Sequence, residues 1–235
     1  MALADIGSAL KDAREIDHGP SLMYALFVAA KLNIYSGYYA AASKHADEIV
    51  TFATQKGVGF WKAFGVLDQS VASALLGNSS DAVQKIASAI NAYRSMGSTV
   101  SLPEYLGYLA NAHAQLGQID DAWHCIDEAT IMEASGETWY EAEVNRVAGE
   151  IALKAPKSDA AKAEAYFDRA LAIARQQQAK SWELRAAMSM ARLWRDQGKR
   201  EEARDLLAPV YGWFTEGFET LDLKEAKALL DELAT

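Results

Sequence analysis

The sequence predicts an all-helical protein built from helix pairs with a period of about 40 residues, a length typical of helical-repeat proteins. Alanine, leucine, glutamate and lysine are abundant, whereas prolines are few and runs of β-branched residues are absent. This composition is typical of helical proteins. An alanine also recurs near the start of every second helix, at an interval that is constant to within one position. These alanines are Ala42, Ala82, Ala122, Ala163 and Ala203.

The first segment, 2–16, is predicted to be a helix that forms the second half of a repeat. Its apolar residues are spaced three and four residues apart, as on one face of a helix. Ala2 lies one such interval before Ala42, so the chain is expected to begin within a repeat, as a piece of a longer protein. Gly19 and Pro20 end this helix, because both residues interrupt helical backbone.

Five complete helix pairs are predicted to follow. The turn within each pair lies at Gly37, Gly77, Gly117, Ser158 or Gly198, five residues before the recurrent alanine. Asn78 to Asp81 is expected to cap a second helix. The predicted pairs are 21–35 with 38–55, 60–76 with 79–95, 101–116 with 119–134, 138–154 with 159–178, and 181–196 with 200–214. The corresponding repeats span about 20–56, 58–96, 100–135, 138–178 and 180–215.

The C-terminal segment is predicted to close the array. Pro209 is expected to bend or weaken the helix that contains it, because proline removes one backbone hydrogen bond. Residues 221–233 form a final helix, the first half of a further repeat, which caps the last apolar face. We therefore expect a single solenoid domain over 1–235, with a half repeat at 1–17 and a capping helix at 221–234.

Small residues recur in the first helices, and a bulky apolar residue follows most of the recurrent alanines by four positions. The small residues are Ala30, Ser70, Ala110, Gly149 and Ala191, and the bulky ones are Ile86, Ile126, Phe167 and Leu207. This arrangement resembles the tetratricopeptide repeat (TPR), with a period longer than the standard length of about 34 residues. The resemblance implies an all-α, right-handed superhelical solenoid of TPR-like repeats, whose first helices line a concave face.

Charge is distributed unevenly along the chain. Residues 1–100 carry eight basic and eight acidic side chains, whereas residues 101–235 carry 15 basic and 24 acidic ones, which accounts for the net charge of −9. An acidic chain without a basic stripe is a poor nucleic-acid binder, because phosphate contacts need clustered Lys and Arg. The local basic excess at 180–204 is interpreted as a solvated helix face.

The single cysteine and the hydropathy pattern indicate where in the cell the protein is expected. Cys125 is alone, so no disulfide can form within the chain, and it is expected to be buried in an amphipathic helix. A reducing, cytoplasmic setting fits this cysteine usage. No apolar segment is long enough to predict a membrane span, and no membrane partner is expected.

No motif in the sequence indicates catalysis. There is neither a Gly-x-x-x-x-Gly-Lys-Ser/Thr phosphate loop nor a Gly-x-Ser-x-Gly nucleophile turn. The histidines lack the paired spacing of metal ligands. Neighbouring carboxylates such as Glu141 and Glu143 are interpreted as ordinary helix charges. We therefore expect no catalytic residue, cofactor or metal ion.

Candidate binding residues come from the expected concave face. In TPR geometry, the inward positions of 181–196 are Arg185, Met188, Arg192 and Arg195. The equivalent positions in other repeats are Tyr24, Phe27, Lys31, Tyr108, Asn111, Arg146 and Glu150. Arginine binds carboxylates through two parallel hydrogen bonds, so an acidic segment of a protein partner is a candidate ligand. The alternative is that these residues are simply solvated charges.

Bulky pairs open several first helices, such as Phe60-Trp61 and Trp139-Tyr140. They are interpreted as packing between repeats, with stacking on a ligand as the alternative.

Residues 179–233 carry a more specific resemblance. The segments are AKSWELRAAMSMARLWRDQG at 179–198, ARDLLAPVYGWFTEGF at 203–218 and DLKEAKALLDEL at 222–233. They resemble the extreme C-terminus of bacterial signalling proteins that join a class III adenylate/guanylate cyclase domain, or another output domain, to an AAA-type ATPase module and a long TPR-like tail. The resemblance implies a regulatory tail, and no cyclase or ATPase residue can be placed in this chain.

The sequence thus predicts a non-catalytic interaction module that receives a signal from a protein partner, a peptide or upstream domains of its parent chain. The alternative is a small-ligand sensor that holds an effector inside the superhelix. That alternative requires an enclosed pocket lined by aromatic side chains.

Overall fold

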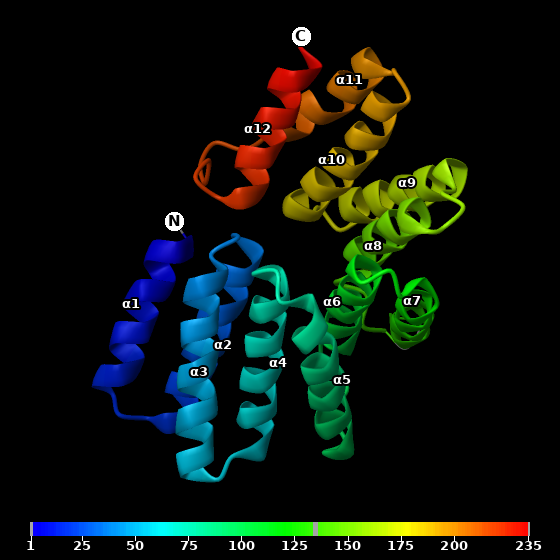
Figure 1. Ribbon diagram of the computed structural model, residues 1–235. Coiled ribbons are helices and arrows are strands. Elements are labelled where there is room, and N and C mark those ends of the chain that lie inside the picture. Colours follow the sequence, from blue (N-terminus) through cyan, green and yellow to red (C-terminus); the bar gives the residue numbers. More distant parts are fainter. Residues whose placement is uncertain (1, 134–135, 235) are drawn as a thin grey trace. The chain divides into compact units, whose positions relative to one another are not determined.

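Within residues 2–133 and 136–234, which this computed structural model describes, all regular secondary structure is α-helical. The all-helical prediction is confirmed. The chain divides into two compact units, residues 1–100 (unit 1) and 101–235 (unit 2), each with helices stacked side by side (Figure 1). The expectation of one continuous domain over 1–235 stays a prediction.

Unit 1 begins with the predicted lone helix and continues with two helix pairs. Its helices are α1 (Ala2–Glu15), α2 (Gly19–Tyr35), α3 (Tyr39–Lys56), α4 (Gly59–Leu75) and α5 (Ser79–Ser95). Each helix packs against the next one along the chain, and the first helices α2 and α4 also contact each other. The side chain of Ala2, which lies one repeat interval before Ala42, is outside the described residues.

Unit 2 contains three helix pairs and the predicted C-terminal helix. Its helices are α6 (Leu102–Gln115), α7 (Ile119–Glu133), α8 (Glu141–Lys154), α9 (Ala160–Gln176), α10 (Lys180–Asp196), α11 (Arg200–Tyr211) and α12 (Leu221–Leu233). Residues 134 and 135, at the end of the predicted third repeat, lie outside the described residues.

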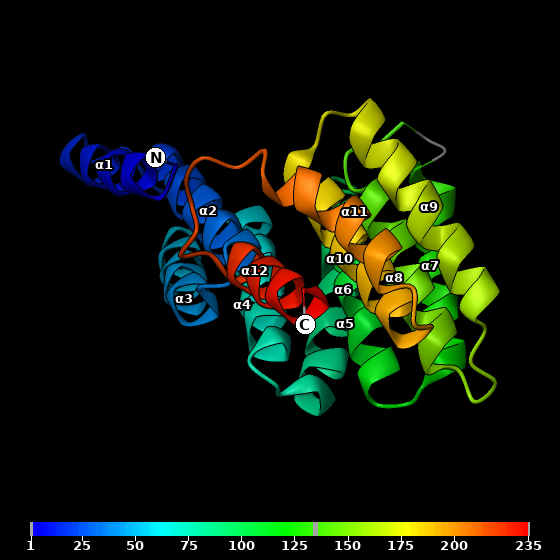
Figure 2. The ribbon, with the colours of Figure 1, turned by 90° about the horizontal axis from the view of Figure 1, so that it is seen from above.

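The first helices of unit 2 form one continuous row. Beyond the contacts between consecutive helices, α6 packs against α8, α8 against α10, and α10 against α12. Figure 2 shows the second helices α7 and α9 on one side of this unit, with α6, α10 and α12 on the other. We call the surface formed by the row α6, α8, α10 and α12 the inner face of unit 2.

The recurrent small residues are where the helices meet most closely. All five recurrent alanines from Ala42 to Ala203 are fully buried. At Gly149 of α8, an added Cβ would lie 2.3 Å from a ring carbon of Phe167 in α9, closer than any real contact. The repeat therefore keeps a small residue here because a bulky ring of the partner helix occupies the space.

Turn chemistry explains why the helices end where they do. Gly198 adopts φ +80°, and the N–H of Lys199 donates to the carbonyl of Trp194 at 2.8 Å. This 6→1 hydrogen bond, together with a glycine at positive φ, is the Schellman motif that commonly ends a helix. In the fourth predicted repeat, which has Ser158 at the glycine position, Asp159 caps α9 by accepting a hydrogen bond from the N–H of Lys162 at 2.9 Å. Asn78, expected to cap α5, makes no such side-chain bond.

Two helix boundaries differ from the prediction by three residues. The helix α8 begins at Glu141 and not at residue 138, since a turn precedes it in which the N–H of Glu141 donates to the carbonyl of Thr138 at 3.1 Å. The helix α11 ends at Tyr211 and not at residue 214. It contains Pro209, which lacks the N–H that helical bonding needs, and it ends just before Gly212.

Candidate functional site

The inner face of unit 2 carries a connected group of charged side chains. Its centre is Glu143 on α8, which is only 3% exposed. One carboxylate oxygen, Oε1, lies 2.7 Å from Nη2 of Arg146 and 3.6 Å from Nη1 of Arg185 on α10. A buried carboxylate needs such partners, because an isolated charge away from water is very costly.

The two arginines determine the protonation state of Glu143. Burial alone would raise its pKa, but the opposing charges of Arg146 and Arg185 hold that pKa below its usual value. The pKa of Arg185 is raised well above its usual value, since Asp222 and Glu143 outweigh the effect of burial. The group is therefore fully ionised at neutral pH.

Further contacts tie α8 to α10 beside Glu143. Glu150 lies 3.5 Å from Nη1 of Arg146 and accepts a hydrogen bond from the hydroxyl of Ser189 at 2.7 Å. On α6, the pKa of Tyr108 is raised well above its usual value by burial and by the neighbouring charge of Glu104, so its hydroxyl stays neutral. These contacts fix the side chains in place.

Three arginines along α10 are paired with three carboxylates along α12. The distances are 2.6 Å for Arg185 to Asp222, 2.7 Å for Arg192 to Glu225, and 3.0 Å for Arg195 to Glu232. We call Arg185, Arg192 and Arg195 the arginine row. Its residues are not merely solvated charges, because each one already binds an acidic side chain of the neighbouring helix.

Unit 1 has an inner face of different character. Tyr24 and Phe27 on α2 pack with Trp61 on α4, with ring centroids 6.0 to 6.5 Å apart. Beneath them, Lys31 and Asp68 form a buried ion pair at 3.0 Å. Tyr24 is 60% exposed, so this aromatic group reaches the surface, whereas Lys31 is not accessible.

The candidate binding residues predicted from the sequence differ in where they lie and in how exposed they are. Tyr108, Arg146, Glu150 and Arg185 lie in or beside the group around Glu143, while Arg192 and Arg195 lie further along α10. Asn111 is half-buried on α6. Met188 is 3% exposed and belongs to the hydrophobic core, so it is not available to a partner in this conformation.

Sequence reasoning missed the acidic half of this site. The interpretation of Glu143 as an ordinary helix charge is wrong, because its carboxylate is buried between two arginines. The spacing of Glu143 and Arg146 at i and i+3 was the available signal. Asp222, Glu225 and Glu232 carried no such signal, because their partners lie 33 to 37 residues away.

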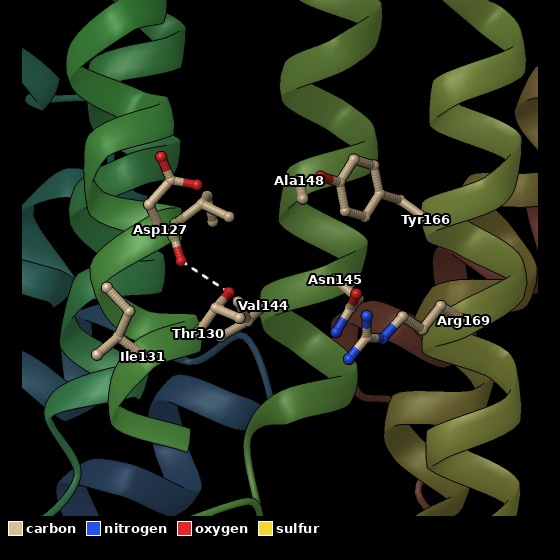
Figure 3. Close-up of a pocket in the computed structure, with 9 residues that line it drawn as sticks. Asp127, Thr130, Ile131, Val144, Asn145, Ala148, Tyr166 and Arg169 are labelled. Atoms are coloured by element: carbon tan, nitrogen blue, oxygen red, sulfur yellow. Dashed lines mark hydrogen bonds between the residues drawn. The ribbon is translucent and has the colours of Figure 1, made fainter. Parts of the chain in front are cut away.

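The cavity in Figure 3 bears on the small-ligand alternative. It has a volume of about 510 Å³ and lies between α7, α8 and α9, away from the row of first helices. Val144 and Ala148 form an apolar floor, with Asp127 on one side and Arg169 on the other. Tyr166 is the one aromatic residue among those that line it. It is therefore not the enclosed aromatic pocket that a sensor was expected to have.

No group of three or more His, Cys, Asp or Glu in the described ranges is arranged to hold a metal ion. None of the helices in the same ranges combines the length and apolarity that crossing a lipid bilayer requires. Cys125 is buried, as expected.

Stacked helix pairs with a continuous row of first helices define a TPR-like repeat protein. Solved structures agree with this fold. RapI in its apo form is similar with a TM-score of 0.69 at 15% identity, over 98% of this chain and 77% of that one. BtubC (BKLC) from P. vanneervenii is similar with a TM-score of 0.62 at 17% identity, over 97% and 91% of the two chains.

A third similar structure is a substituted form of the nearly identical TPR-like repeats of a kinesin light chain from Podosopora anserina. Its TM-score is 0.56 at 16% identity, over 83% of this chain and 95% of that one. Such identities establish the fold alone. No family model and no curated protein matches the chain. The fold prediction is thus confirmed: the chain is a TPR-like helical-repeat protein.

Proposed function

We propose that this chain is a non-catalytic protein-interaction module and that the inner face of unit 2 is its recognition surface. The observation that carries the proposal is the arginine row, which lies along one first helix and points to carboxylate recognition. TPR-like folds typically bind protein segments. The partner is a protein or peptide with an acidic segment, or an upstream domain of the parent chain.

The exposure of the row supports this role. The side chains of Arg192 and Arg195 are 39% and 26% exposed even when paired with α12. Arg195 also binds Asp196 on α10 at 2.9 Å. A guanidinium has five N–H donors, so each of the two arginines still has donors for a further carboxylate. Arg185 is more enclosed and serves mainly to hold Glu143 and Asp222 in place.

We infer further that the module is the cytoplasmic, signal-receiving tail of a bacterial signalling protein of the cyclase/ATPase type. This inference rests on the resemblance of residues 179–233. In that role, binding at the inner face would be passed on to catalytic domains of the same protein.

The alternative, a small-ligand sensor, has one observation in its favour. The cavity between α7 and α9 has a volume within the usual range of ligand pockets, about 300–1,000 Å³. A ligand bound there would raise the melting temperature in a metabolite screen, since binding to the folded state stabilises it. A screen without any such increase contradicts the sensor.

The interaction proposal is tested by affinity capture with two matched variants of the full chain. Arg192→Glu/Arg195→Glu reverses two charges of the arginine row. Lys199→Glu/Arg204→Glu makes the same change of charge at exposed residues at the start of α11. We expect the first variant to lose the captured partner and the second to keep it. Equal capture by both variants, or no specific capture by the wild type, contradicts the proposal.

A further inference from the structure

The C-terminal helix α12 matches the arginine row in direction and in the separation of its two outer charges. The first and last arginines, Arg185 and Arg195, are ten residues apart, and so are their partners Asp222 and Glu232. Ten helical residues extend about 15 Å, so the two helices have charges at the same separation. The pairs occur in the same order along both helices, so α12 runs parallel to α10.

The apolar face of α12 lies next to its acidic edge. Leu223, Ala226, Leu229 and Leu233 are buried in the same core cluster as residues of α10 and α11. The opposite face is polar, with Lys224, Lys227 and Asp231 exposed. The helix is therefore amphipathic, with carboxylates at i, i+3 and i+10 and apolar residues at i+1, i+4, i+7 and i+11.

We propose that the arginine row binds an acidic amphipathic helix of a partner protein and that α12 occupies this surface as a built-in competitor. The proposal rests on the proposed function and names the partner of the same inner face. The chemistry of the occupant is taken directly from α12, whose leucines and carboxylates fit this surface. A partner helix with the same spacing makes the same contacts.

Two of the three ion pairs are weak enough to exchange. In the pairs Arg192–Glu225 and Arg195–Glu232, every side chain is between 26% and 51% exposed. Exposed pairs of this kind contribute little to stability, because water screens them. The apolar contacts and the pair of Arg185 with Asp222 hold α12 more firmly.

The short connection to α11 gives α12 its advantage over a partner. Residues 212–220 join the two helices, so α12 is always close to the row. A short tether of this kind corresponds to an effective concentration on the order of millimolar. A partner helix therefore binds measurably only when it fits better than α12 or when α12 is weakened.

The test measures the binding of a fluorescent peptide to the full-length chain by fluorescence anisotropy. The peptide has the sequence of residues 219–234. Glu225→Gln/Glu232→Gln removes two ion pairs and leaves the arginine row intact. Arg192→Gln/Arg195→Gln removes the same two pairs but neutralises two of the three arginines in the row. Both variants lose the same two contacts to α12. They differ in whether the arginines remain and in the contact of Arg195 with Asp196, which lies on α10 itself.

We expect the glutamate variant to bind the peptide about 10-fold more tightly than the wild type does, which is the change produced by losing two exposed pairs. The arginine variant should show no such gain. A peptide with glutamine in place of Glu225 and Glu232 should lose most of the gain. Hydrogen exchange in 221–233 should be faster in both variants, which confirms that α12 is weakened in each.

Equal affinities of the wild type and the glutamate variant would overturn the proposal, and so would an equal gain in both variants. Either result leaves the interaction module standing if the charge-reversed row still loses its captured partner. Conversely, peptide binding as expected with no captured partner would contradict the proposed function alone. The affinity capture and the peptide-binding experiment can therefore contradict the proposed function and the role of α12 independently.

Discussion

Glu143 illustrates how one side chain depends on its surroundings. It is buried, and its charge is compensated by Arg146 on the same helix and by Arg185 on α10. Removing the carboxylate leaves two enclosed cations with less compensation, which is more costly than losing a surface pair. The identity of this residue is therefore set by contacts between helices and not by helix propensity.

Glu143→Gln should lower the free energy of unfolding by about 3 kcal/mol at pH 7, because it breaks a buried ion-pair group. The pKa of Glu143 is lower in the folded state than its usual value of 4.5. Its contribution to stability is therefore complete above pH 4.5 and is lost as the pH falls through the lowered pKa. Urea unfolding of wild type and variant from pH 7 to pH 3 measures the difference, which should shrink towards acid pH.

The exposed Glu201 provides the control for this experiment. Glu201→Gln on the surface of α11 should change the free energy of unfolding by less than about 0.5 kcal/mol at pH 7. A difference between Glu143→Gln and wild type that stays constant down to pH 3 would show that the charge of Glu143 is not the cause.

Among the helices, most boundaries follow from local sequence chemistry. Most predicted boundaries agree with the structure within two residues, because glycines end the helices and apolar spacing defines their length. The exceptions are the start of α8 and the end of α11. Pro209 and Gly212 lie at the end of α11, and a turn closed by the hydrogen bond from Glu141 to Thr138 precedes α8.

The N-cap residues Asp159 and Asn78 have similar side chains but should differ in their contribution to stability. Asp159 accepts a hydrogen bond from the N–H of Lys162, whereas Asn78 makes no side-chain cap bond. Asp159→Ala should therefore lower the free energy of unfolding by about 1 kcal/mol, the usual value for a lost cap. Asn78→Ala should cost less than half as much. Equal losses in urea unfolding would contradict this assignment of the caps.

The whole chain contains two units, each with its own buried residues. In unit 1, Leu26 is fully buried in a cluster with residues of α1 and α3. In unit 2, Leu207 is fully buried in a cluster that extends from α8 to α12. Each core is formed from helices of one unit, which suggests that stability is also distributed unit by unit.

Leu26→Ala and Leu207→Ala should therefore act on different parts of the chain. Each removes a fully buried side chain and should cost about 2–5 kcal/mol. Hydrogen exchange measured by mass spectrometry should show the larger loss of protection within 2–100 for Leu26→Ala and within 101–234 for Leu207→Ala. A uniform loss along the chain in both variants would instead indicate one cooperative unit.

The sequence by itself determined the helical repeat and the place of most helices. The signals were local: an alanine at a nearly constant interval, glycines at turns and small residues at close contacts such as Gly149. It also placed Arg185, Arg192 and Arg195 along a single face, because helical spacing depends on neighbouring residues alone.

Only the tertiary structure decided which of these charges are available. It buried Met188 and Lys31, placed Glu143 between two arginines, and set the carboxylates of α12 against the arginine row. The ion pairs between α10 and α12 join residues 33 to 37 positions apart. Such pairs depend on how whole helices pack, and the local spacing of side chains contains no information about that packing.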